Sequence, residues 1–319
     1  MTTKKFDVYS INDEIEETFD VFICASSFEK RCLTIPERLS TSPFTRIIAV
    51  ECSSTSNYVK CNTDLLKKYF NHNLSIIRFD FKNPMLLANQ FINEINALQN
   101  DNLKVLIDIT AFTHENLLII INYLYHNKGV HNITCVYVNA KEYCPGLPVD
   151  KKWLSIGARR PHSVYGLSGL LLPSQKNHLI LIVGYEYHRA ISVISNIEPS
   201  SLTLLSGLES HVLTEKDKEA NSFFEGLVSD MAFNYSNIER KQIPCNDPED
   251  TAKELECLYK KYSDKNIIVV PMNSKMSTLG VYLSVKDNEN ICVSYAPAIV
   301  YNETNYSISG TECYVFSLK

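Results

Sequence analysis

Short apolar runs alternate with longer amphipathic segments along the whole sequence, and this alternation limits the possible folds more than any other feature. Runs such as residues 104–109, KVLIDI, contain few polar side chains on either face. Strands of this kind are typical of parallel sheets that helices cover on both sides. Strands that alternate with helices predict βαβ units with right-handed crossovers. We therefore expect an α/β chain with two tandem Rossmann-like, doubly wound parallel sheets.

Each half of the chain is expected to contribute five strands joined by four helices. The predicted strands are 20–25, 46–51, 75–80, 104–109 and 133–139, then 178–183, 201–205, 238–243, 267–271 and 291–296. The predicted helices lie near 28–39, 57–71, 84–98 and 113–127, then 187–196, 215–233, 248–262 and 276–285. These elements divide the chain into a first Rossmann-like domain (1–150), a connecting segment (151–177) and a second Rossmann-like domain (178–319).

The two halves also resemble each other in sequence. Arg31 and Arg189 are 158 positions apart, as are Tyr137 and Tyr295. An Asn-Pro pair at 83–84 is matched by an Asp-Pro pair at 247–248, where the first residue suits a helix cap and proline suits the first helical position. We therefore expect an internal duplication.

Charge and cysteine content exclude several classes of protein. The net charge of −5 argues against a general duplex-DNA coat, although residues 151–177 carry five basic residues and no acidic one. None of the ten cysteines forms a CxxC pair, which favours buried thiols in a reducing compartment. The N-terminus has no apolar leader and no apolar run spans a bilayer, so we expect a cytoplasmic protein without a membrane partner. No spacing indicates a metal site or a cofactor motif.

Ligands of open parallel sheets bind beyond the carboxyl ends of the strands, so the residues after each strand are the candidates for a site. After the first strand, Ser26, Ser27 and Arg31 either hold a phosphate or form a capped helix with a surface arginine. After the fourth strand, Asp108 is either paired within the protein or faces a cleft, because an unpaired buried carboxylate is costly, and Thr110 can donate to a ligand.

The second half offers a comparable set of candidates. Ser274 and Lys275 precede a predicted helix and suit an anion, or are a cap and a solvated first-turn residue. Arg189 lies early in the predicted helix 187–196, after Glu186. In the connecting segment, Arg159 and Arg160 bind phosphate or pair with carboxylates of the protein. Two aromatic residues offer surfaces on which a base would stack: Trp153 and Tyr301.

The Asp108-Ile109-Thr110 turn, together with the polar residues after the first strand, resembles the CRISPR-associated Rossmann fold (CARF) and its relatives. These proteins sense cyclic or linear oligonucleotide messengers in prokaryotic defence. Phe112 stands where the Asp-x-Thr-x-Gly turn of the family has glycine, and the lysine that follows has its counterpart in Lys275. The segments ASSFEKRCL, WLSIGARRPHSVYG and VPMNSKMSTLGVYL also resemble uncharacterised bacterial proteins of phage-defence neighbourhoods.

The resemblance implies a nucleotide- or oligonucleotide-binding sensor of a bacterial anti-phage system, whose partner is a protein from the same operon. Two other functions are compatible with the residues. One is a nucleotide-acting hydrolase or glycosidase, with Asp108 or Glu186 as acid/base and Arg159 and Arg160 as clamps. The other is a docking subunit of a defence complex. A monomer and a homodimer are both allowed.

Overall fold

The computed structural model divides the chain into two compact units. It describes residues 3–318 except for 16, 53–55, 72, 81, 99, 101, 128, 129, 131, 209–214 and 233–237. Unit 1 comprises Met1–Lys141 and Ser307–Lys319, and unit 2 comprises Glu142–Tyr306. This division differs from the expected one, because the segment 151–177 belongs to unit 2 and the last strand of the chain returns to unit 1.

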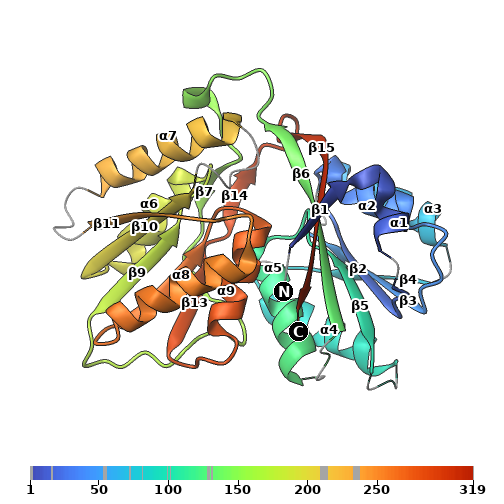
Figure 1. Ribbon diagram of the computed structural model, residues 1–319, viewed down its shortest axis with the longest axis horizontal. Coiled ribbons are helices and arrows are strands. Elements are labelled where there is room, and N and C mark those ends of the chain that lie inside the picture. Colours follow the sequence, from blue (N-terminus) through green and yellow to red (C-terminus); the bar gives the residue numbers. More distant parts are fainter. Residues whose placement is uncertain are drawn as a thin grey trace. The chain divides into compact units, whose positions relative to one another are not determined.

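Unit 1 is built on a seven-stranded sheet in which parallel pairs dominate. The red C-terminal strand β15 lies between blue β1 and green β6, so the two ends of the chain share one edge of the sheet (Figure 1). The pairing of β1 with β15 is antiparallel, whereas the strands from β6 to β4 run parallel. In sheet order the strands are β1 (Lys4–Asp7), β15 (Ser307–Leu318), β6 (Asn132–Tyr143), β5 (Lys104–Asp108), β2 (Val21–Ser26), β3 (Arg46–Glu51) and β4 (Leu74–Arg78).

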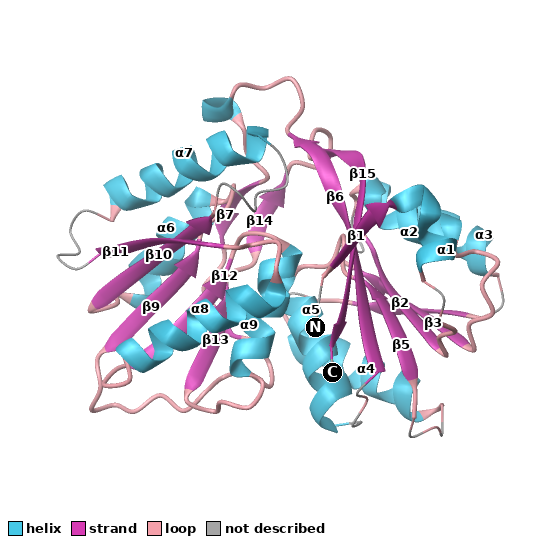
Figure 2. Cartoon of the chain, in the orientation of Figure 1, coloured by secondary structure: helices cyan, strands magenta, loops and turns pink. Residues whose placement is uncertain are grey.

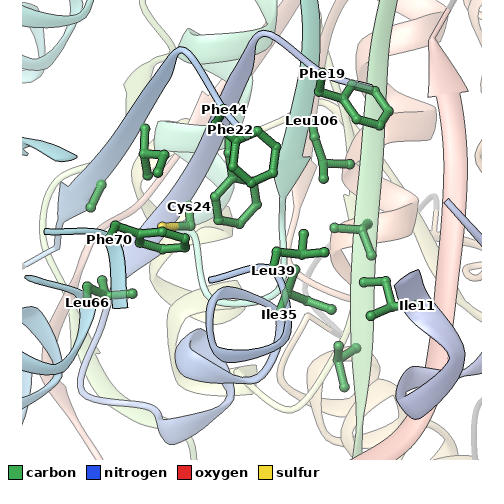
Figure 3. Packing of buried hydrophobic residues seen from close by; sticks show 14 of the residues in the cluster. Ile11, Phe19, Phe22, Cys24, Ile35, Leu39, Phe44, Leu66, Phe70 and Leu106 are labelled. Atoms are coloured by element: carbon green, nitrogen blue, oxygen red, sulfur yellow. The ribbon is translucent and has the colours of Figure 1, made fainter. Parts of the chain in front are cut away.

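The helices of unit 1 follow the strands as the crossover rule requires. Right-handed crossovers place α2 and α3 on one face of the sheet and α4 and α5 on the other. Phe22 of β2 stacks on Phe44 with ring centroids 5.2 Å apart, in a core that also includes Ile35 and Leu106 (Figure 3). The helices are α1 (Ile11–Glu14), α2 (Thr34–Arg38), α3 (Asn57–Phe70), α4 (Pro84–Asn96) and α5 (His114–Asn122), which continues into a π-helical turn (Tyr123–Asn127).

Unit 2 repeats the arrangement on a six-stranded sheet in the order β11-β10-β9-β12-β13-β8. Its helices lie on both sides of the strands (Figure 2), with α6 against α7 and α8 against α9. The two-stranded ribbon of β7 and β14 completes the unit. The strands are β7 (Ser155–Ala158), β8 (His162–Ser163), β9 (Asn177–Ile182), β10 (Ser201–Gly207), β11 (Ile238–Ile243), β12 (Asn266–Pro271), β13 (Ile291–Tyr295) and β14 (Ala298–Tyr301), and the helices are α6 (Tyr187–Ile197), α7 (Glu215–Met231), α8 (Pro248–Lys261) and α9 (Lys275–Val285).

The predicted α/β class and all ten predicted strands are confirmed, and one predicted helix is not continuous. Residues 28–39 form a 3-10 turn (Lys30–Leu33) followed by the short helix α2. Pro36 explains the break, because proline is tolerated only in the first turn of a helix, so α2 begins at Thr34. The predicted helix 215–233 ends at Met231, and position 233 lies outside the described residues.

Candidate functional site

Arg31 lies inside unit 1 and not on its surface. The side chain is 3% exposed, its Nε donates to the Glu29 carboxylate, and its Nη1 donates to the carbonyl of Val138 at 2.9 Å. The hydroxyl of Ser307, the first residue of β15, donates to the same carboxylate. Arg31 is therefore not the surface arginine that one reading of the sequence expected, while its binding of a phosphate stays a prediction.

Asp108 ends β5 beside this pair, and it is 2% exposed. One carboxylate oxygen accepts from the amide of Thr110 at 3.0 Å, and the Thr110 hydroxyl accepts from the amide of Val138. Burial raises the pKa of Asp108 to about 7, against the opposing effects of the Thr110 hydrogen bonds and the Arg31 guanidinium. Asp108 is thus paired within the protein, as a buried carboxylate at a strand end requires.

The two serines after β2 are also engaged within unit 1. The Ser26 hydroxyl lies 2.7 Å from the hydroxyl of Thr63, and both groups are buried. The Ser27 hydroxyl accepts from the amide of Glu29, and the backbone carbonyl of Ser27 accepts from the side chain of Asn62 at 2.7 Å. The first unit therefore gathers the predicted residues Ser26, Ser27, Arg31, Asp108 and Thr110 near one sheet edge, where each has a protein partner.

Unit 2 contains a second buried arginine at the same place in its fold. Arg189 lies in the first turn of α6, is 2% exposed, and donates from Nη1 to the Glu186 carboxylate. Its Nε donates to the carbonyl of Ala296 at 2.8 Å. The Ser155 hydroxyl donates to the other oxygen of Glu186 at 2.6 Å, so both oxygens of that carboxylate are engaged.

One tyrosine ring contacts the Arg189 guanidinium, and two further tyrosines act on its charge. Its carbon lies 5.1 Å from the centre of the Tyr295 ring, within the range of a cation–π contact. Burial acts against the charged form, but Glu186 and the tyrosines at 295, 301 and 306 outweigh it, so the pKa of Arg189 is raised and the cation persists. Nη2 is buried and has no hydrogen-bond partner among the described residues. An unsatisfied buried donor of a charged group is costly, so it marks a place where a further acceptor would bind favourably.

The turn between β12 and α9 forms the neighbouring part of the same sheet edge. The Asn273 side chain donates to the carbonyl of Val183 at 2.5 Å, across the point where the strand order reverses. A Cβ on Gly184 would come within 2.4 Å of a backbone oxygen in this turn, so only glycine permits such a close approach. Ser274 caps α9 by accepting from the amide of Ser277 at 2.9 Å. Lys275 is the first residue of that helix and is half-buried.

The remaining predicted residues lie on or beside the β7–β14 ribbon. Ser155 and Tyr301 are cross-strand neighbours in the ribbon, so it delivers both side chains to the Arg189 cluster. Arg159 and Arg160 are exposed just beyond the end of β7. Trp153 is half-buried, and its carbonyl accepts from the side chain of Asn302 at 3.1 Å.

Sequence reasoning missed Glu29 and the two serines that close the clusters, and it named Glu186 as a candidate acid/base group rather than as the ion-pair partner of Arg189. Glu29 precedes Arg31 by two residues, and Glu186 precedes Arg189 by three. Only the second spacing was an available signal, because oppositely charged residues three apart face each other on a helix, whereas residues two apart do not. Ser155 and Ser307 had no such signal, since each approaches its glutamate from a distant part of the sequence.

Nothing in the described residues indicates a metal centre or an activated thiol. No group of three or more His, Cys, Asp or Glu side chains is placed to hold a metal ion in the described ranges. Seven of the ten cysteines are buried, as expected, and burial raises the pKa of Cys24 and Cys32. Within the part of the chain that the structure describes, helices long and apolar enough to cross a membrane are absent.

Comparison with known proteins finds only distant structural similarities. No protein-family model and no curated protein matches the sequence. Among solved structures, an NADPH-bound carbonyl reductase from chicken fatty liver aligns over 85% of this chain and 92% of its own, with 7% identity and a TM-score of 0.29. An N-terminal ketoreductase from a macrolactin assembly line aligns over 91% and 72%, with 9% identity and a TM-score of 0.25. These similarities are too distant to bear on a ligand.

Proposed function

We propose that the chain binds a nucleotide or a short oligonucleotide at the carboxyl edge of the unit 2 sheet and acts as a sensor rather than a catalyst. The observation that carries this proposal is the buried Nη2 of Arg189, which lacks an acceptor among the described residues. A phosphate oxygen would satisfy it with a charge-assisted hydrogen bond. Nearby, Tyr295 and Tyr301 offer aromatic surface for a base.

The position of this arginine in the fold also supports a ligand site. Open α/β sheets bind ligands beyond the carboxyl ends of their strands, near the point where the strand order reverses. In unit 2 that point lies between β9 and β12. Arg189 lies in the first turn of α6, the helix that follows β9. The β12–α9 turn, with Lys275 at the N-terminus of a helix, adds a second group suited to phosphate.

Access to Arg189 requires an element of unit 2 to move, because the side chain is 2% exposed. The β7–β14 ribbon is the element best suited to do so. It carries Ser155 and Tyr301 on adjacent strands, and a two-stranded ribbon is only marginally stable on its own. We infer that the ligand displaces the ribbon and that this displacement is the signal. The resemblance to defence sensors supports an oligonucleotide messenger as ligand and a separate effector protein as partner.

A hydrolase is less well supported by the same geometry. Both oxygens of Glu186 are held by Arg189 and Ser155, and Asp108 is buried in the other unit. Neither carboxylate is free to accept a proton from a substrate without losing its present partners.

The test is a thermal-unfolding screen against mononucleotides, linear dinucleotides and cyclic oligonucleotides, with the products examined by mass spectrometry. A ligand at a hundredfold excess over its Kd should stabilise the native chain by about 2.7 kcal/mol without being consumed. Arg189→Lys keeps the positive charge but loses the planar fork, and it should weaken binding by roughly tenfold or more. The matched control is Arg240→Lys, because Arg240 is an exposed arginine of the same unit that pairs with Glu225.

Three outcomes would overturn the proposal. The first is a screen in which no nucleotide stabilises the chain. The second is binding that Arg189→Lys leaves unchanged. The third is turnover of the ligand, which would make the protein an enzyme.

A further inference from the structure

The two buried arginines share their surroundings on three sides. Each donates to a glutamate that precedes it, and each glutamate also accepts a serine hydroxyl. Each also donates to a backbone carbonyl that lies 107 residues further along the chain. These matched contacts agree with an internal duplication, which itself stays a prediction. With these three contacts matched, the remaining neighbour of each arginine, the residue at the end of the adjacent strand, can be compared between the two units.

The strand register shows which residue of unit 2 corresponds to Asp108. In unit 1, β2 pairs with β5 so that Ile23 lies beside Ile107, and continuing by one residue places Asp108 beside Cys24. Cys24 precedes Arg31 by seven residues, and Ile182 precedes Arg189 by seven. The register partner of Ile182 on β12 is Pro271. Pro271 therefore takes the position of Asp108 at the end of the fourth parallel strand.

The sites consequently differ by one carboxylate. Arg31 has Glu29 as its ion-pair partner, and its charge also acts on Asp108. Arg189 has Glu186 alone as an acidic neighbour among the groups that act on it, together with the tyrosines. Nη2 of Arg189 is also the guanidinium nitrogen that is left without an acceptor. The Arg189 guanidinium therefore has less of its charge neutralised and one N–H donor unused, and an anion from solution would supply both the charge and the acceptor.

We propose that Asp108 occupies in unit 1 the place that a phosphate of the ligand takes in unit 2, so that the chain has one open anion site and one closed copy of it. This inference rests on the proposed function, and it names the residue that decides which unit binds. Asp108 closes the first site, and Pro271 leaves the second open. Each chain accordingly holds one phosphate or pyrophosphate group of its ligand, in unit 2, and unit 1 has a structural role.

The experiment measures the stoichiometry and affinity of pyrophosphate binding by calorimetry at pH 8. The wild-type chain should bind one equivalent. Arg189→Lys should weaken that binding at least tenfold, whereas Arg31→Lys should leave it within about twofold. Urea unfolding of each variant verifies that it is folded, since both arginines are buried in ion pairs.

Two substitutions change the residue at the end of the fourth parallel strand, Asp108 in unit 1 and Pro271 in unit 2. Asp108→Ala should open unit 1, so that a second equivalent binds and is lost again in the double variant Asp108→Ala, Arg31→Lys. Pro271→Asp should close unit 2 and abolish binding to the otherwise wild-type chain. If Pro271→Asp does not fold, the Asp108→Ala result decides alone, because it leaves unit 2 intact.

The outcomes separate this inference from the proposed function. Two equivalents bound by the wild-type chain, or a folded Asp108→Ala chain that still binds one, would overturn the inference while leaving a nucleotide site in unit 2 possible. Binding that is absent from the wild-type chain but appears in Asp108→Ala would refute the proposed function and the open site in unit 2, and would support only the part of the inference in which Asp108 closes the site in unit 1. Absence of binding in both chains would overturn both.

Discussion

Replacing Asp108 with asparagine should stabilise the protein in a way that depends on pH. The carboxyl group is 2% exposed, and burial is the main cause of its raised pKa. Asparagine has nearly the same shape, and its side-chain oxygen can still accept from the amide of Thr110, as the carboxylate does at 3.0 Å. The substitution therefore removes the ionisation and keeps the principal hydrogen bond.

The size of the effect follows from the two pKa values. The carboxyl group titrates at about 7 in the fold and at 3.8 as an ordinary side chain. Between these values the unfolded chain ionises first, so the folded state loses stability as the pH rises from about 4 and the loss levels off above 7. At about 1.4 kcal/mol for each pKa unit, the full penalty is about 4 kcal/mol. Asp108→Asn should thus match the wild type at pH 4 and exceed it by up to about 4 kcal/mol at pH 8.

Urea unfolding at pH 4.5, 6, 7 and 8 measures this difference directly. The control is Asp64→Asn, an aspartate whose side chain is 67% exposed and which pairs with Lys67 on the surface of α3. Its effect should stay within about 0.5 kcal/mol at every pH, as is usual for surface substitutions.

Either of two results would refute this reasoning. If the difference between Asp108→Asn and wild type were the same at pH 4.5 and pH 8, the group would not titrate between them in the fold. If the variant were less stable than wild type at pH 8, attraction to Arg31 would outweigh the cost of burial, and the pKa of Asp108 would be lowered rather than raised.

Three further predictions concern other parts of the chain. Burial lowers the pKa of His178 to about 4, so the free energy of unfolding should fall by up to about 3 kcal/mol as the pH falls from 6.5 to 4. NMR titration of the His178 ring should show a midpoint near 4, and a midpoint near 6.5 would contradict the prediction. Gly184→Ala should destabilise the chain by about 1 to 3 kcal/mol in thermal unfolding, because the added Cβ would collide with backbone atoms. Gly226→Ala should stabilise the chain by up to about 1 kcal/mol, because a Cβ at this position of α7 meets no atom within 4 Å. Equal effects of the two substitutions would show that the turn at Gly184 can relax. A thiol reagent should modify the exposed Cys61 and Cys257 at rates typical of free thiols, and equally fast labelling of the seven buried thiols would show that the native units open readily.

The parallel core of each sheet could be predicted because its signal is local. Runs such as residues 46–51 and 267–271 are apolar at consecutive positions, and burial on both faces of a parallel sheet requires that pattern. The proline after each Asx residue likewise fixes a helix start, and α4 and α8 both begin at a proline. The caps themselves differ, since Asp247 accepts from the amide of Asp250 whereas Asn83 makes no side-chain cap bond.

The antiparallel additions could not be predicted because their partners lie far away in the sequence. β15 pairs with β1 at the opposite end of the chain, and β7 pairs with β14 more than a hundred residues later. Pairing between strands so far apart in the sequence produces no recognisable pattern beyond the short apolar stretch of the strand itself, such as Ser155–Ala158. The division into units depends on the same long-range pairing, which is why it lies at residue 142 and not at 150.

The burial of the two arginines shows how far a sequence can lead toward a site. Position after the first strand, and the offset between the halves, selected Arg31 and Arg189, which the structure places in matching surroundings. Their environment depended on a carbonyl 107 residues away and on serines from other strands, none of which a local pattern encodes. A charged side chain enters a core only when such partners neutralise it, so its burial is a property of the whole fold. The difference between Asp108 and Pro271, which decides the chemistry of each site, became visible only when the strand register aligned them.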